Sequence, residues 1–148
     1  MAELQSSKDS DKPIILIVDD EMDMRIFMST LFETSGCRPV AVRDGRQGLA
    51  KAAALKPRLI ILDVMMPGEG GALMYKALKS NPELSHIPVI MCSAVAQISF
   101  EHYLKMINAR LQTSLPDPEG YMEKPPDPGS LLELARRVMA SAEANPDT

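Results

Sequence analysis

The stretch Ile14-Ile15-Leu16-Ile17-Val18-Asp19-Asp20 decides the fold of this chain. It joins a continuous apolar run, mostly β-branched, directly to a pair of acids. Such a run predicts a strand that is buried on both faces, as in a parallel sheet. Arg58–Leu62 and Ile87–Cys92 are runs of the same kind. We therefore expect a parallel sheet whose strands alternate with helices.

Helical patterns fill the spaces between these runs. Asp44 is the expected N-cap of one helix, and Asp127-Pro128 supplies an N-cap and a first-turn proline for the last one. Apolar residues recur at helical spacing from Phe100 to Leu111. The expected helices are 23–35, 45–56, 72–79, about 100–111 and 129–144.

Proline in the second strand selects a topology. Arg38–Val42 contains Pro39, which cannot donate a ladder hydrogen bond in the middle of a sheet. An edge position for this strand fits a doubly wound, flavodoxin-like sheet with the order 2-1-3-4-5, in which a short run at Gly120–Met122 is the fifth strand. The expected fold class is therefore α/β, a five-stranded parallel (βα)5 sheet.

Length and composition exclude several classes of protein. The chain has 148 residues, which predicts one domain and leaves no room for a multidomain enzyme. A net charge of −4 argues against a nucleic-acid surface. Two cysteines are too few for a disulfide framework, and no apolar run resembles a signal peptide or approaches the roughly 20 residues of a membrane span. We expect a cytoplasmic protein that contacts neither nucleic acid nor membrane, with a folded domain at 13–143 and disordered tails at 1–12 and 144–148.

The acids at the strand ends predict a cation site. In the expected topology the first and third strands are neighbours, so Asp19, Asp20 and Asp63 meet at the carboxyl edge of the sheet. Carboxylates this close repel one another unless a positive group neutralises them, and Mg²⁺ suits an all-oxygen, partly hydrated site. One carboxylate could then act as a nucleophile toward a phosphoryl group. Lys124 and Ser93, near the ends of the fifth and fourth strands, are the candidate cation and hydroxyl.

Collectively these residues resemble the receiver domains of two-component response regulators, across nearly the whole folded unit. Seen alone, each acid would more often be a helix cap, and the tyrosine a core residue. The residues that carry the resemblance are, in chain order, Asp19-Asp20 followed by Glu21, Asp63-Val64-Met65-Met66-Pro67-Gly68, Ser93-Ala94, and Tyr121-Met122-Glu123-Lys124-Pro125.

The resemblance implies a role for each site residue. Asp63 would be the phosphoacceptor, and Asp20 and Asp63 would hold Mg²⁺ with the backbone carbonyl of Met65. Asp19 would help through water, and Lys124 would pair with the phosphate. Ser93 and Tyr121 would be the switch: the hydroxyl moves toward the phosphoryl group and the ring rotates into the vacated space. The Lys124-Pro125 peptide is often cis in this family.

The implied function is that of a stand-alone response regulator, with no sequence left for an output domain. It would accept a phosphoryl group from a histidine kinase or a histidine phosphotransfer protein, and catalyse only its own phosphorylation and dephosphorylation. It would then signal to a downstream protein through the surface of the fourth helix, fifth strand and last helix, as a monomer or a phosphorylation-dependent dimer. The alternatives are a receiver-like scaffold without phosphate turnover, an aspartyl-phosphate phosphatase, whose usual D-x-D is absent, and a flavin-binding domain, whose first loop would not be acidic.

Two departures from the family pattern stand out. The loop after the phosphoacceptor reads Pro67-Gly68-Glu69-Gly70-Gly71, which predicts a looser loop. The stretch from Ser93 to Lys124 is roughly ten residues longer than usual, which predicts a private partner or dimer contact. In addition, Met65 and Val95 are apolar where an attacking water would approach, which predicts slow self-dephosphorylation.

Overall fold

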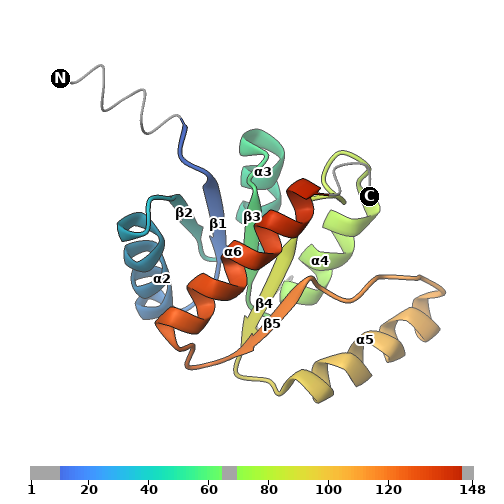
Figure 1. Ribbon diagram of the computed structural model, residues 1–148. Helices are drawn as coiled ribbons and strands as arrows, with labels where there is room; N and C mark the ends of the chain where they lie inside the picture. The colour runs from blue at the N-terminus through green and yellow to red at the C-terminus, as the bar shows by residue number, and fades with distance from the viewer. Residues whose placement is uncertain (1–10, 65–69, 145–148) are drawn as a thin grey trace.

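The computed structural model has one parallel five-stranded sheet in the order β2-β1-β3-β4-β5 (Figure 1). It describes residues 11–64 and 70–144. The strands are β1 (Ile14–Val18), β2 (Arg38–Val42), β3 (Leu59–Leu62), β4 (Val89–Ser93) and β5 (Gly120–Glu123). The helices are α2 (Met22–Thr34), α3 (Gly45–Leu55), α4 (Gly70–Ser80), α5 (Gln97–Leu111) and α6 (Pro128–Ala144). The expected fold class and strand order are confirmed.

Helices cover both faces of the sheet, which is why the central strands are apolar on both sides. Successive side chains of a strand point to opposite faces. In β1, Leu16 and Val18 pack into a core beneath α3, α4 and α5. Ile15 and Ile17 pack into a second core beneath α2 and α6 (Figure 1). Alternate side chains of the IILIV run therefore pack into the two cores on opposite faces of the sheet.

The edge position of β2 is the one that Pro39 predicts. β2 pairs in parallel with β1, and Pro39 lies opposite Ile15 in the register. β1 and β3 are neighbours in the middle of the sheet, with Val18 opposite Leu62. The residues that follow these two strands therefore start from adjacent positions at the carboxyl edge.

Helix starts agree with the capping residues in the sequence. The Asp44 side chain accepts a 2.8 Å hydrogen bond from the backbone N–H of Gln47. Asp127 accepts one of 2.9 Å from the N–H of Ser130. Several element ends differ from expectation by one or two residues; in particular, Ser93 is the last residue of β4 rather than the first residue beyond it.

The longer stretch between β4 and β5 consists of α5 and residues 112–119, which form neither helix nor strand. α5 lies at the margin of the molecule in Figure 1, and the segment 112–119 returns from its end to β5. Only Phe100 and Leu104 of this helix are buried. Ile98, Tyr103, Met106 and Leu111 of α5 are exposed.

Within residues 11–64 and 70–144, no helix combines the length and apolarity that crossing a membrane requires.

Candidate functional site

Acidic side chains from the ends of two adjacent strands converge at the carboxyl edge of the sheet. Asp19, Asp20 and Glu21 follow β1, and Asp63 follows β3. One carboxylate oxygen of each of the four lies within 4.8 Å of the others. Asp19 and Asp63 are buried, whereas Asp20 and Glu21 are exposed. The cluster therefore has a buried part, Asp19 and Asp63, and an exposed rim, Asp20 and Glu21.

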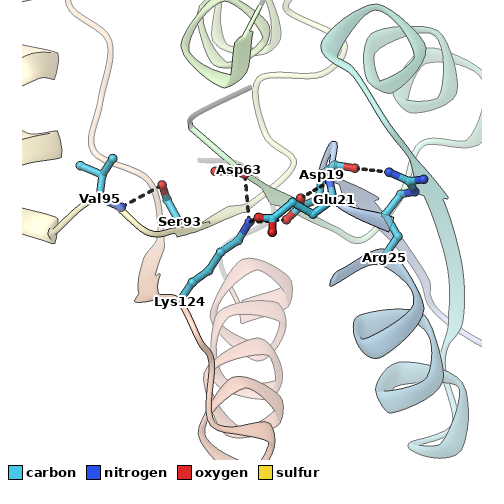
Figure 2. Close-up of polar contacts among 7 residues, drawn as sticks. All are labelled: Asp19, Glu21, Arg25, Asp63, Ser93, Val95 and Lys124. Atoms are coloured by element: carbon cyan, nitrogen blue, oxygen red, sulfur yellow. Dashed lines mark hydrogen bonds and ion pairs between the residues drawn. The ribbon is translucent and has the colours of Figure 1, made fainter. Parts of the chain in front are cut away.

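Lys124 brings an ammonium group into this cluster from the far end of β5 (Figure 2). Its Nζ lies 2.8 Å from Asp19 Oδ2, 2.7 Å from Glu21 Oε1 and 3.0 Å from Asp63 Oδ2. Its side chain is 8% exposed, so these carboxylates replace water around the charge. Burial alone would lower the pKa of Lys124, but its bonds to the three carboxylates outweigh that effect and raise the pKa. The ammonium is therefore charged at neutral pH.

Asp19 is the most deeply placed acid of the cluster. Its Oδ1 accepts a 2.9 Å hydrogen bond from the backbone N–H of Glu21. Its Oδ2 is in ionic contact with Lys124, yet it is buried and accepts no hydrogen bond from the described residues. Burial raises the pKa of Asp19, while the contacts with Lys124 and Glu21 oppose that rise. Figure 2 shows Arg25 turned toward the backbone carbonyl of Asp19, to which it donates a 2.9 Å bond.

These residues fit a hard divalent cation. Four carboxylates lie together, three of them contact a single ammonium, and a buried oxygen of Asp19 lacks a hydrogen bond from the described residues. An all-oxygen donor set with an exposed side for water is the kind that Mg²⁺ takes. Asp20 and Asp63 are placed to supply ligands, with Asp19 behind them. The third ligand implied by the resemblance, the Met65 carbonyl, lies outside the described residues.

Ser93 ends β4, and Tyr121 lies in the neighbouring strand β5, opposite Met91 in the register. The Ser93 hydroxyl accepts a 3.2 Å hydrogen bond from the backbone N–H of Val95. The Tyr121 hydroxyl donates to the carbonyl oxygen of Val95, and its ring packs 5.5 Å from that of Phe100 in α5. Burial raises the pKa of Tyr121, although a hydrogen bond with Ser93 opposes this. A polar contact thus runs from the sheet edge to the first turn of α5.

Gly71 places α4 directly against the backbone of Asp63. A Cβ atom at position 71 would lie 1.9 Å from the carbonyl oxygen of Asp63, which no side chain can tolerate. The N–H of Gly71 donates to the carbonyl oxygen of Val64. The sequence predicted only a looser loop, but Gly71 is needed for close packing of α4 against Asp63. Residues 65–69 of that loop lie outside the described part of the chain.

The structure thus brings together Asp19, Asp20, Asp63 and Lys124, and sets Ser93 and Tyr121 next to one another. The Lys124-Pro125 peptide bond is cis. Sequence reasoning noted Glu21 but gave it no role, although its carboxylate makes the shortest contact with Lys124. The signal was its place at the N-cap of α2, where a glutamate is a poor cap.

Comparison with known proteins gives a consistent result. A family model described as the response regulator receiver domain matches residues 15–136. Among curated proteins, the polar-differentiation response regulator DivK of Brucella anthropi is 29% identical over 131 residues, which cover 88% of this chain and 98% of DivK. DivK of Brucella ovis shows the same identity and coverage.

Solved structures give the same picture. The chemotaxis protein CheY4 of Vibrio cholerae is 27% identical, with a TM-score of 0.70 over 86% of this chain and 98% of that one. A CheY-like receiver domain protein of Methanospirillum hungatei is 26% identical, with a TM-score of 0.74 over 91% and 99% of the two chains. The receiver domain of a putative LuxO repressor protein from Vibrio parahaemolyticus, 21% identical with a TM-score of 0.75 over 90% and 95%, supports the fold.

Proposed function

Because the chain belongs to the family of response regulator receiver domains, we propose that Asp63 is its phosphoacceptor. The observation that carries this proposal is the placement of the Asp63 carboxylate. It is 4% exposed, lies at the carboxyl edge among three other acids, and accepts a 3.0 Å hydrogen bond from Lys124. A nucleophile next to a fixed cation, at an edge open to water on its Asp20 side, suits phosphoryl transfer.

The proposed donor is a phosphohistidine of a histidine kinase or of a histidine phosphotransfer protein. An oxygen of Asp63 forms the new bond to phosphorus, the bond from phosphorus to the donor nitrogen breaks, and its electron pair stays on the histidine ring. Lys124 donates to an oxygen of the transferring group. Asp20, Asp63 and the Met65 carbonyl would hold Mg²⁺, with Asp19 acting through water, and the bound ion would supply positive charge that offsets the acids and the phosphoryl oxygens.

We expect the output to travel through Ser93 and Tyr121. The Ser93 hydroxyl moves to a phosphoryl oxygen, and the Tyr121 ring follows into the space that it leaves. Support comes from the contacts of Tyr121, which join Ser93, the Val95 carbonyl and Phe100 of α5. The surface formed by α5, β5 and α6, which is the family's fourth helix, fifth strand and fifth helix, then changes its affinity for a downstream protein.

The remaining assignments belong to the same proposal. The receiver domain spans 13–143, acts in the cytoplasm, and contacts neither nucleic acid nor membrane. It catalyses only its own phosphorylation and dephosphorylation, and is a monomer or a phosphorylation-dependent dimer.

Intact-mass measurement after incubation with acetyl phosphate and Mg²⁺ tests this function. The parent should gain one phosphoryl group and Asp63→Asn should gain none. Asp23→Asn is the matched control, because Asp23 is an exposed acid in the first turn of α2. Absence of any gain in the parent would favour a scaffold without phosphate turnover, and an equal gain in Asp63→Asn would move the acceptor elsewhere.

A further inference from the structure

We propose that Glu21 is a positioning residue that competes with the phosphoryl group for the ammonium of Lys124, and so restrains phosphorylation. This inference rests on the proposed function of Asp63. It concerns which carboxylates hold Lys124 before a phosphoryl group arrives.

The Lys124 ammonium contacts three carboxylates at different distances. Its Nζ makes hydrogen bonds of 2.7 Å to Glu21 and 3.0 Å to Asp63. Asp19 Oδ2 lies 2.8 Å away, but receives no hydrogen bond although it is buried. A buried acceptor without a hydrogen bond is costly, whereas an exposed carboxylate can be solvated by water. Of the three carboxylates, Glu21 makes the shortest contact with Lys124, although it is the partner that water could replace most easily.

Among the residues that the structure describes, the contact with Lys124 is the interaction that accounts for the position of the Glu21 side chain. Glu21 is the N-cap residue of α2, but its side chain makes no capping hydrogen bond. The side chain is 60% exposed and reaches across to a lysine 103 positions later, itself 8% exposed. An exposed side chain gives up rotamer freedom to hold this contact. Figure 2 shows the two side chains meeting close to Asp19 and Asp63.

The arrangement has a direct consequence for phosphoryl transfer. A lysine ammonium has three N–H donors, and here three carboxylate oxygens, from Asp19, Glu21 and Asp63, already lie within 3.0 Å of it. A phosphoryl oxygen that approaches Asp63 must draw Lys124 toward itself, against the pull of Glu21 at the rim. Removing the Glu21 charge frees that donor, so the acyl phosphate should form faster.

A double-mutant cycle tests the competition. Initial rates of phosphorylation by acetyl phosphate at saturating Mg²⁺ are measured for the parent, Glu21→Gln, Lys124→Ala and the double variant. Glu21→Gln should be about two- to fivefold faster than the parent, the size of one partly exposed ion pair. In the Lys124→Ala background the same substitution should have no effect, because the two residues act as a unit.

Two results would overturn the proposal. One is the absence of acceleration in Glu21→Gln. The other is an equal acceleration with and without Lys124, which would mean that Glu21 only repels the anionic donor. Asp23→Asn, which removes the same charge from the same helix, should keep the parent rate.

A second measurement separates this inference from the proposed function, since it needs neither phosphate nor metal. In ¹⁵N-lysine-labelled protein the Lys124 ammonium signal, assigned with Lys124→Arg, should shift in Glu21→Gln and stay in place in Asp23→Asn. An unchanged signal in Glu21→Gln contradicts the inference even if Asp63 is phosphorylated. A shifted signal supports the contact between Glu21 and Lys124 even if the parent takes up no phosphate, and in that case the proposed function of Asp63 fails while the contact stands.

Discussion

The buried hydroxyl of Tyr75 donates a 2.6 Å hydrogen bond to the carbonyl oxygen of Pro116, which joins α4 to the segment 112–119. Asn108 of α5 holds the same segment, because its side chain accepts from the N–H of Leu115 and donates to the Leu115 carbonyl. Glu119 ends the segment with a 2.7 Å hydrogen bond from the N–H of Val89. The longer connection is thus held at several points.

Tyr75→Phe should destabilise the protein by about 1 kcal/mol, because it removes this hydrogen bond and preserves the packing of the buried ring. Urea unfolding measures the loss, and amide hydrogen exchange should quicken at 113–119. The matched control is Tyr103→Phe, since Tyr103 is 40% exposed on α5. Equal stability and exchange in parent and Tyr75→Phe would mean that the bond does not hold the segment.

Mg²⁺ should raise the melting temperature of the protein. A ligand that binds only the folded state at ten times its dissociation constant stabilises by about 1.4 kcal/mol, or roughly 3–6 °C for a chain of this size. Differential scanning fluorimetry with MgCl₂, and then with excess EDTA, measures the shift and its reversal. Asp20→Asn should lose it, because Asp20 is an exposed member of the carboxylate cluster. A full shift in that variant would place the ion elsewhere.

Asp19→Asn should stabilise the metal-free protein more at pH 7 than at pH 4. Burial raises the folded-state pKa of Asp19 above its ordinary value of 3.8. The folded state therefore binds the proton more tightly than the unfolded chain, and stability falls as the pH rises from 3.8 through the folded pKa. The neutral amide removes this loss, with a gain of order 1 kcal/mol at pH 7.

The control for this pH effect has the opposite sign. Hydrogen bonds from the backbone and side chain of Ser130 hold the pKa of Asp127 below its ordinary value. Its contribution to stability is therefore present above pH 3.8 and is lost as the pH falls through the folded pKa. Urea unfolding should show Asp127→Asn losing stability at pH 7 and, because pH 4 still lies above 3.8, most of that stability at pH 4 as well. A gain for Asp19→Asn that does not depend on pH would refute the role of its charge.

Val95→Gln should shorten the life of the phosphorylated form. Val95 follows Ser93 by two residues and hydrogen-bonds to its hydroxyl, so a polar side chain there can hold a water near the acyl phosphate. Loss of phosphate, followed by intact mass after removal of the donor, should speed up about three- to tenfold, near 1 kcal/mol in the barrier. Ala96→Gln, at the exposed next residue, should behave as the parent. The same lifetime in Val95→Gln and the parent would show that this side chain does not exclude water.

Strand pattern and strand ends made most of the fold predictable from sequence. The IILIV run predicted a doubly covered strand because side chains on both of its faces must be apolar, and Pro39 predicted the edge because it lacks a donor. The meeting of Asp19 and Asp63 followed from strand order alone. These inferences depend on backbone topology, which a residue pattern constrains strongly.

Contacts set by side-chain rotamers and loop paths could not be predicted in this way. Glu21 and Lys124 are 103 positions apart, and their contact depends on how two long, flexible side chains turn. Tyr75 was visibly part of an apolar helix face, but its acceptor at Pro116 lies in a segment without periodicity. Position 71 must be glycine because α4 packs directly against the backbone of Asp63. No turn motif in the sequence predicts this requirement.

The contacts that hold the two ends of α5 separate the exposed surface of this helix from the carboxylate cluster. At its first turn the helix is bound through Glu123, whose carboxylate accepts a 3.1 Å hydrogen bond from the N–H of Gln97, and at its far end through Asn108. The contact at the far end involves residues 112–119, which belong to the Ser93 to Lys124 stretch. Mutations in this segment can change which partner binds the exposed face of α5. The acids that follow β1 and β3 would not be altered by such mutations.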